Sequence, residues 1–383
     1  MRPRSPHGMS GPAGEPLVTV VIPVYREPER LACLLDTLLA PGWPPREILV
    51  PVDEPDGDME ALIQAYEERG VRFIVSRERR GKVAALNDAV SRARGRLIVF
   101  LDNDVQVDKG FLKTVVEAME GSDVGEIKKV ARGRSLLARM VNYDYLSFGV
   151  SCYLFYSRLR RCAGLNGAAF AMTLDALKEL GGFKRCVLED LDAGYRSYFH
   201  GLRFRYIYET EAVVDPPRSW GEWLEQRKRW VIGTALWAKE YFFQLRKSAK
   251  KNKLLSLAAL LVLFPATLFP WIIIFSSLRP VESLALIALY FLTGYVGAFF
   301  PITLLLSYSL SFLILRTLAA LTGYFAVYAA ATWYYARKIR FPVNPFWLAV
   351  YFFFYAPLWY TLLVAGFIRV IVFKKRDVKG WKI

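Results

Sequence analysis

The chain has 383 residues, of which 54% are hydrophobic, and its 51 Lys and Arg residues exceed its 35 Asp and Glu residues to give a formal net charge of +16. This composition excludes a disordered chain and a soluble enzyme of ordinary composition, and the length predicts two or three domains. Residues 254–383 hold 11 basic and 2 acidic residues in a mostly apolar stretch. We therefore expect the basic excess to meet a lipid bilayer, with no nucleic acid as partner.

The beginning of the chain gives no targeting signal. Residues 1–16 are rich in Pro and Gly without an apolar run, so we expect a flexible tail and not a signal peptide. We therefore expect the first half of the chain to stay in the reducing cytoplasm. The four cysteines form no C-x-x-C pair, which argues against a zinc or thioredoxin-like site. Scarce Asn and Gln are compatible with a thermophilic source.

The first half of the chain alternates predicted strands with predicted helices. Strands are expected at residues 18–23, 47–52, 71–76 and 97–101, and helices at 30–39, 61–69 and 82–93. This order predicts an α/β, Rossmann-like domain with a parallel sheet and helices on both faces. Ligands bind at the carboxyl ends of such strands. Asp53 and Asp102, which follow the second and fourth strands, should therefore lie on the same edge.

Two later segments are candidates for helices on a membrane surface. Residues 135–161 mix apolar and aromatic residues with arginines, and an ordinary packed helix explains this pattern equally well. Residues 220–253 combine cationic residues, Arg227 among them, with a tryptophan stripe. Four tryptophans fall within about 100° of one helical face: Trp220, Trp223, Trp230 and Trp237. Tryptophan prefers the membrane interface, so we expect an interfacial helix; a stripe buried in a core is the alternative.

Residues 254–373 are predicted to cross the membrane about four times. The stretch 283–336 contains Arg316 as its single charge and would be about 80 Å long as a helix, so we expect two spans with a break near 307–311. Residues 346–373 form the last span, interrupted by Pro357, and 374–383 form a cytoplasmic tail. The basic loop 337–340 would then lie outside, against the positive-inside tendency. Three spans plus one interfacial segment are the alternative.

Three groups of residues suggest chemistry. Asp102-Asn103-Asp104 places two carboxylates after a strand, where they can bind Mg²⁺ or Mn²⁺ and a diphosphate, although acidic turns are also common there. Glu189-Asp190 is a candidate for a general base with a tuned pKa, or an acidic helix N-terminus. In the helix segment 226–230, arginine can bind phosphate and tryptophan can provide a stacking surface. The alternative is that this segment contacts lipid headgroups.

Together these motifs resemble family 2 glycosyltransferases, in the branch of cellulose, hyaluronan and chitin synthases. Residues 20–27 are similar to the opening strand and nucleotide loop, and 81–87 to the G-K-x-x-A-L-N segment. The other matches follow in the family's order: Asp53, Asp102-Asn103-Asp104, Asn166-Gly167-Ala168 with Gly181-Gly182-Phe183, Leu188-Glu189-Asp190 in place of [T]-E-D, and Gln226–Trp230 for Q-[QR]-x-R-W. The resemblance covers about residues 17–245. In size and layout the chain also resembles small archaeal membrane mannosyltransferases.

The resemblance implies a GT-A domain at 17–219 and sugar transfer with inversion. The basic cluster 246–253, just before the long apolar run, indicates that the catalytic domain of this cell-membrane protein is cytoplasmic. Asp53 would contact the nucleoside, while Asp102 and Asp104 would hold the nucleotide sugar and its divalent ion. Asp190 would be the general base, next to Glu189. The remaining residues would hold the diphosphate or the acceptor: Gln226, Arg229, Trp230 and, as a further diphosphate contact, Lys82.

The substrates are less sharply defined. GDP-mannose is the first candidate among several nucleotide-sugar donors, with a lipid-linked glycan as acceptor. A processive polysaccharide synthase that uses a UDP-sugar is an alternative. A polyprenyl-phosphate sugar synthase is another, although such enzymes typically lack the Q-x-x-R-W helix. A membrane-anchored binding protein that has lost the chemistry is disfavoured by the intact acidic residues.

Overall fold

The computed structural model describes residues 18–25, 28–41, 46–162, 164–251, 287–289, 291–292 and 300–374. The predicted N-terminal tail lies outside these residues. So do most of 254–299, where the first membrane spans are expected, and all of the C-terminal tail except Lys374.

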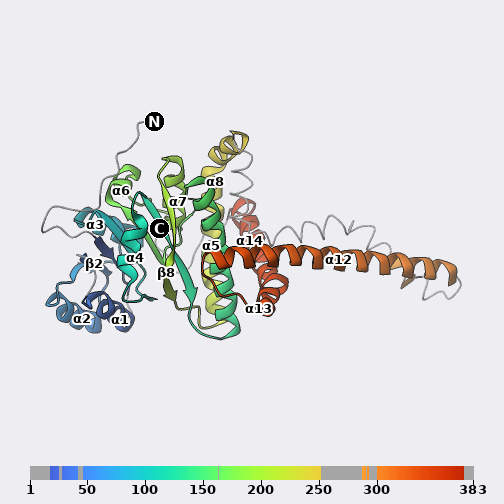
Figure 1. Cartoon of the computed structure of the whole chain (residues 1–383), viewed down its shortest axis with the longest axis horizontal. Helices are drawn as coiled ribbons and strands as arrows, with labels where there is room; N and C mark the ends of the chain where they lie inside the picture. The colour runs from blue at the N-terminus through green and yellow to red at the C-terminus, as the bar shows by residue number, and fades with distance from the viewer. Residues whose placement is uncertain are drawn as a thin grey trace.

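An eight-stranded sheet forms the centre of the described part of the chain (Figure 1). Its strands, in spatial order, are β3 (Arg72–Ser76), β2 (Arg46–Asp53), β1 (Val18–Val21), β4 (Leu97–Leu101), β7 (Ala169–Thr173), β6 (Val124–Ala131), β8 (Phe204–Val214) and β5 (Val105–Gln106). The first four strands pair in parallel, which confirms the α/β prediction. β7 runs antiparallel to both of its neighbours, so the second half of the sheet is mixed.

Helices cover both faces of this sheet because the buried strands are apolar on both sides. In the first strand, Val20 packs into one hydrophobic cluster and Val21 into the other. The helices of one layer are α1 (Pro28–Leu39), α2 (Gly57–Glu67) and α4 (Phe111–Met119), and those of the other are α3 (Lys82–Arg92), α5 (Leu136–Leu159), α6 (Leu174–Leu180) and α7 (Glu189–Phe199). α5 buries nine of its residues, so it is the ordinary packed helix and not a surface helix.

The long helix α8 (Trp220–Lys251) packs against α7 and α5 and against the C-terminal segment described below. Trp223 is 2% exposed and Trp237 is 6% exposed, whereas Trp220 is 45% exposed. The expectation that the tryptophan stripe faces the membrane interface is therefore wrong for Trp223 and Trp237. Arg227, which we expected among the headgroup contacts, is also buried.

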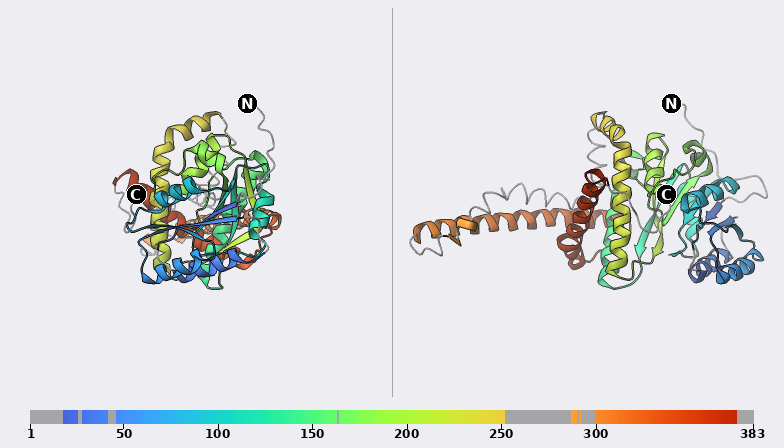
Figure 2. Two further views of the ribbon diagram at one scale, coloured as in Figure 1. Left: turned by 90° about the vertical axis from the view of Figure 1, so that its left-hand side faces the viewer. Right: turned by 180° about the vertical axis from the view of Figure 1, so that it is seen from behind.

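α12 (Phe300–Lys338) is a continuous helix that extends away from the sheet (Figures 1 and 2). The predicted break near 307–311 is therefore wrong. After α12 the chain returns to the α/β domain: Lys128 Nζ donates to the Arg340 carbonyl at 3.2 Å, and the Tyr143 hydroxyl donates to the Asn344 carbonyl at 2.8 Å. The basic loop after α12 thus contacts the α/β domain, and this contact contradicts the expectation that the loop lies across the membrane from that domain.

The last apolar segment consists of α13 (Pro345–Val350), the π-helical turn η1 (Tyr351–Tyr355) and α14 (Ala356–Ile371). By length and composition, two described helical segments qualify as candidate membrane spans, Ile314–Lys338 and Pro345–Ile371. The second packs against α8 and α5, and Figure 2 shows it beside α8, running across the direction of α12. This packing favours the alternative in which the last segment is interfacial and does not form a fourth span.

A buried ion pair joins these elements. Arg227 on α8 forms an ion pair with Asp144 on α5 at 2.5 Å, and its guanidinium lies over the rings of Trp230 and Trp359. The Tyr355 hydroxyl donates to Asp144 at 2.6 Å. Arg227 therefore links α8, α5 and the C-terminal segment through a single side chain.

We expect Arg227→Met to destabilise the protein by about 3–5 kcal/mol, because it leaves Asp144 charged and buried without its cation. Replacing both partners, with Asp144→Leu added, should recover most of that loss. Thermal unfolding of the detergent-purified protein measures both. Lys228→Met is the matched control, since Lys228 is a more exposed neighbour on the same helix, paired with Glu225. A double variant whose unfolding temperature is no higher than that of the single variant would contradict this account.

Candidate active site

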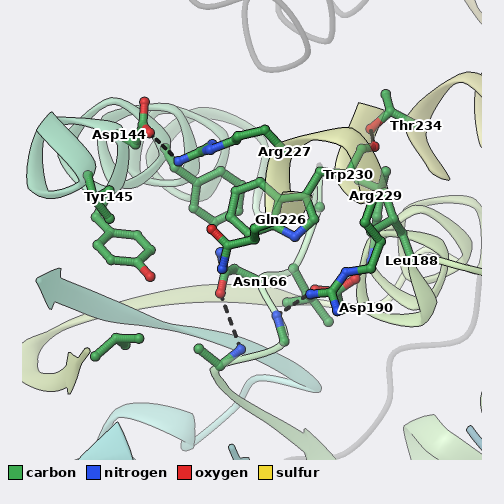
Figure 3. A pocket seen from close by; sticks show the side chains of 18 of the residues that line it. Asp144, Tyr145, Asn166, Leu188, Asp190, Gln226, Arg227, Arg229, Trp230 and Thr234 are labelled. Atoms are coloured by element: carbon green, nitrogen blue, oxygen red, sulfur yellow. Dashed lines mark hydrogen bonds and ion pairs between the residues drawn. The ribbon is translucent and has the colours of Figure 1, made fainter. Parts of the chain in front are cut away.

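One cavity of about 320 Å³ gathers side chains from distant parts of the sequence (Figure 3). Among its lining residues are most of those predicted from the motifs: Lys82, Asp102, Asp104, Glu189, Asp190, Gln226, Arg229 and Trp230. They come from α3, the loop after β4, the start of α7 and α8. The fold thus brings together in one place four motifs that are separated by long intervals in the chain.

Asp53 is the predicted site residue that does not line this cavity. It lies at the end of β2, is 5% exposed, and accepts a hydrogen bond from the Gly81 amide at 2.8 Å. Gly81 has a φ of 89°, a conformation that suits glycine, and it immediately precedes α3. Asp53 therefore fixes the turn that presents Lys82, and its contact with a nucleoside stays a prediction.

Lys82 connects the two acidic motifs. Its ammonium lies 2.9 Å from Asp102 Oδ1 and 3.2 Å from Glu189 Oε1. Burial alone would lower the pKa of Lys82, but these two carboxylates outweigh it and raise the pKa above its usual value. The lysine therefore stays charged and holds the D-x-D loop close to the start of α7.

Asp104 has a different environment from Asp102. Burial, together with the charge of Asp102, raises the pKa of Asp104 to about 6, and Arg30 at 3.9 Å partly opposes this. A cation between the two carboxylates would relieve their repulsion, and oxygen ligands suit Mg²⁺ or Mn²⁺. In the described part of the chain, no three His, Cys, Asp or Glu side chains are grouped to hold a metal by themselves. The pair therefore fits an ion that takes its other ligands from a diphosphate and water.

Asp190 lies in the first turn of α7 and is held from two sides. Its Oδ2 accepts from the Gly167 amide at 2.5 Å and its Oδ1 from the Leu191 amide at 2.7 Å. Burial and the neighbouring Glu189 raise the pKa of Asp190 to about 6, against the opposing charge of Lys82. A Cβ on Gly167 would lie 2.9 Å from Asp190 Oδ2, so only glycine permits this approach. The result is a carboxylate that two backbone amides orient and whose pKa lies above its usual range.

The first turns of α8 form another wall. Gln226, Arg229 and Trp230 line the cavity, and Figure 3 shows Arg229 reaching toward the side on which Asp190 lies. Sequence reasoning missed Asp144, Tyr145 and Trp359, which also line it. Trp359 belongs to α14, and no motif or spacing connects it to α8. Asp144 carried one signal in the sequence, because it is the single acidic residue of α5.

The comparisons with known proteins agree with this geometry. The model of the family described as "Glycosyltransferase like family 2" matches residues 15–233. "Probable glucomannan 4-beta-mannosyltransferase 3" of Arabidopsis thaliana is 26% identical over 251 residues, covering 58% of this chain and 44% of that protein. "Probable glycosyltransferase YdaM" of Bacillus subtilis is 22% identical, covering 62% of this chain and 60% of its own length. The chain thus spans about half the length of the curated relatives it matches.

A solved structure shares the fold. "Mannosyltransferase PcManGT from Pyrobaculum calidifontis in complex with GDP-Man and Mn2+" has a TM-score of 0.50 and 20% sequence identity, covering 84% of this chain and 86% of that one. At this identity the likeness establishes the GT-A-like α/β architecture and no more. The family match covers more than half of the chain and includes every motif that lines the cavity. The chain therefore belongs to the glycosyltransferase-like family 2.

Proposed function

We propose that this protein is an inverting, metal-dependent membrane glycosyltransferase that moves a sugar from a nucleotide sugar to a hydroxyl group of a lipid-linked glycan. The observation that carries the proposal is the shared cavity. The carboxylate pair Asp102 and Asp104 lies in one wall of the cavity and the buried carboxylate Asp190 in another. Arg229 lines the cavity from α8. Such a site offers charge for a diphosphate and a base for an incoming hydroxyl.

GDP-mannose is the first candidate for the donor. Several curated relatives are described as mannosyltransferases, and the solved neighbour contains GDP-Man and Mn2+. A binding and hydrolysis panel of nucleotide sugars with Mg²⁺ or Mn²⁺ tests the proposal as a whole. Transfer or hydrolysis of at least one donor is expected, and a protein that binds donors without turnover would instead be a binding protein.

In the proposed mechanism, some residues act on the leaving diphosphate and others on the attacking acceptor hydroxyl. Asp102 and Asp104 would hold the Mg²⁺ or Mn²⁺ ion, which supplies positive charge next to the leaving diphosphate. Arg229, with Gln226 and Trp230, would bind the diphosphate or the acceptor end. Asp190 accepts the proton from the acceptor hydroxyl as its oxygen attacks the anomeric carbon on the face opposite the leaving group, which inverts the configuration.

Two faces of α14 support a proposal for the membrane arrangement. Its exposed apolar side chains, Leu358, Val364, Ile368 and Ile371, fall within an arc of about 140°, whereas Trp359 and Leu363 lie on the other side and line the cavity. We propose that α14 lies in the interface of the cell membrane, with α12 crossing the bilayer and the catalytic domain in the cytoplasm. α14 would then separate the active site from the lipid that carries the acceptor.

The descriptions of the plant relatives favour a second candidate, a processive polysaccharide synthase. Extrusion of a polymer needs a polar path through the bilayer. The stretch 283–336 carries Arg316 as its only charge, which favours limited transfer.

Asp104→Asn should reduce the rate of transfer by about two orders of magnitude or more, because it removes a negative charge from the proposed ion site while preserving size. Steady-state rates at saturating donor measure this effect, and EDTA should abolish the wild-type activity. Asp108→Asn is the control, since Asp108 is exposed and lies outside the cavity. Full wild-type activity in EDTA would exclude the metal.

Asp190→Asn should abolish transfer while leaving donor affinity nearly unchanged, because a base acts on the acceptor in the transition state. In the wild type, kcat should rise with pH through about 6, since the pKa of Asp190 is raised to about 6 and only the ionised carboxylate accepts a proton. Rate and donor-binding measurements across pH test both statements.

Asp175→Asn is the matched control for Asp190→Asn, because Asp175 is an exposed aspartate in the first turn of another helix, α6. Normal turnover of Asp190→Asn at saturating donor, combined with weak donor binding, would make Asp190 a binding residue.

The product should carry one or a few added sugars. Purified protein incubated with excess labelled donor and a lipid-linked acceptor should give a single shifted product on electrophoresis or chromatography. A ladder of long chains would identify a polymer synthase instead.

A further inference from the structure

A second buried ion pair lies behind the candidate active site and belongs to none of the motifs. Glu126 and Lys129, both on β6, form an ion pair in which each side chain is 1% exposed. Taking two charges out of water costs several kcal/mol per ion, so a pair in this position is weak evidence of a stabilising role. Its contacts point to a different one.

The pair sits at an irregularity in the sheet. Side chains alternate along a strand, so residues three apart normally point to opposite faces. The register of β6 against β8 shifts between Ile127 and Lys129, within the segment that separates the two partners. Irregularities of this kind re-aim side chains and are common beside active sites. Here the irregularity accompanies a carboxylate directed at the wall of the cavity.

Glu126 holds the loop that orients Asp190. Its Oε2 accepts from the Asn166 amide at 3.0 Å, while its Oε1 is bound to Lys129. The next residue, Gly167, donates its amide to Asp190 Oδ2. Figure 3 shows Asn166 and Asp190 on adjoining parts of the cavity wall. A continuous set of contacts therefore leads from Lys129 through Glu126 and the loop to Asp190.

We propose that Glu126, anchored by Lys129, is a positioning residue that fixes the loop of Asn166 and Gly167 so that Asp190 points at the acceptor hydroxyl. This inference rests on the proposed function for the role of Asp190. It assigns a catalytic contribution to a residue that does not line the cavity. A carboxylate aimed by two backbone amides loses rate steeply when its support moves by about 1 Å.

The charges around Glu126 are consistent with this role. The titratable groups that act on it or feel its charge are Lys129, Asp190, Cys152, Cys162 and Tyr206. Burial raises the pKa of Glu126 to about 7, and Lys129 opposes the rise. Lys129 thus favours the charged form of Glu126, which is the stronger acceptor for the Asn166 amide.

Two double variants separate positioning from charge. Glu126→Gln with Lys129→Met removes both charges but keeps an oxygen that can accept from the Asn166 amide. Glu126→Leu with Lys129→Met removes the charges and the acceptor. Neither variant leaves a lone buried charge, so both are designed to fold. We expect the Leu variant to have a kcat about 10- to 100-fold below that of the Gln variant, with the KM for the donor unchanged within about twofold.

Amide hydrogen exchange of the purified proteins gives a readout that does not require turnover. The amides of Asn166 and Gly167 should exchange faster in the Leu variant than in the Gln variant, whereas amides in β2 should not differ. Lys128→Met is the control, because Lys128 is also buried on β6 but contacts Glu211 and the Arg340 carbonyl instead of the loop.

Equal kcat values for the two double variants would overturn the proposal, whatever their exchange rates. If the wild-type protein transfers no sugar, the proposed function fails on its own. The exchange comparison then decides whether Glu126 fixes the loop: faster exchange in the Leu variant supports positioning, and equal exchange refutes it.

Discussion

The ion pair between Arg227 and Asp144 is the constraint on which the rest of the arrangement depends. A buried guanidinium without its counter-charge is strongly destabilising, so α8, α5 and the turn at Tyr355 must meet at this point. The same helix then brings Arg229 and Trp230 into the cavity. The Arg227–Asp144 ion pair therefore holds α8 in the wall of the cavity. It also attaches the apolar C-terminal segment to the catalytic domain.

Within the cavity, charge is arranged in two regions with Lys82 between them. Lys82 pairs with Asp102 on one side and Glu189 on the other. Asp104 and Asp190, one in each region, both have raised pKa values because they are buried and each stands next to another carboxylate. Both carboxylates are therefore poised to interact with a positive charge or a proton brought by substrates, as the proposed mechanism requires.

α14 links the catalytic domain to the proposed membrane surface. One side of the helix lines the cavity with Trp359 and Leu363, and another exposes apolar side chains such as Ile368 and Ile371. The sequence of a helix with two apolar faces and no charge before Arg369 predicts a membrane-spanning segment. The packing of α14 against α8 fits the proposed position along the interface. Lys128 on β6 separately holds the loop after α12 beside the α/β domain.

The sequence by itself determined the elements and motifs that depend on local order. Alternating apolar strands and helices predicted the parallel half of the sheet, and the acidic motifs with Lys82, Gln226, Arg229 and Trp230 predicted most of the polar cavity lining. Only the tertiary structure decided which buried groups pair: Arg227 with Asp144, and Glu126 with the loop of Asn166. Apolar periodicity does not distinguish a membrane-facing side chain from one buried in protein, so Trp223 and Trp237 of the tryptophan stripe were misassigned. Contacts between residues far apart in the chain are set by packing and charge compensation, which no local pattern encodes.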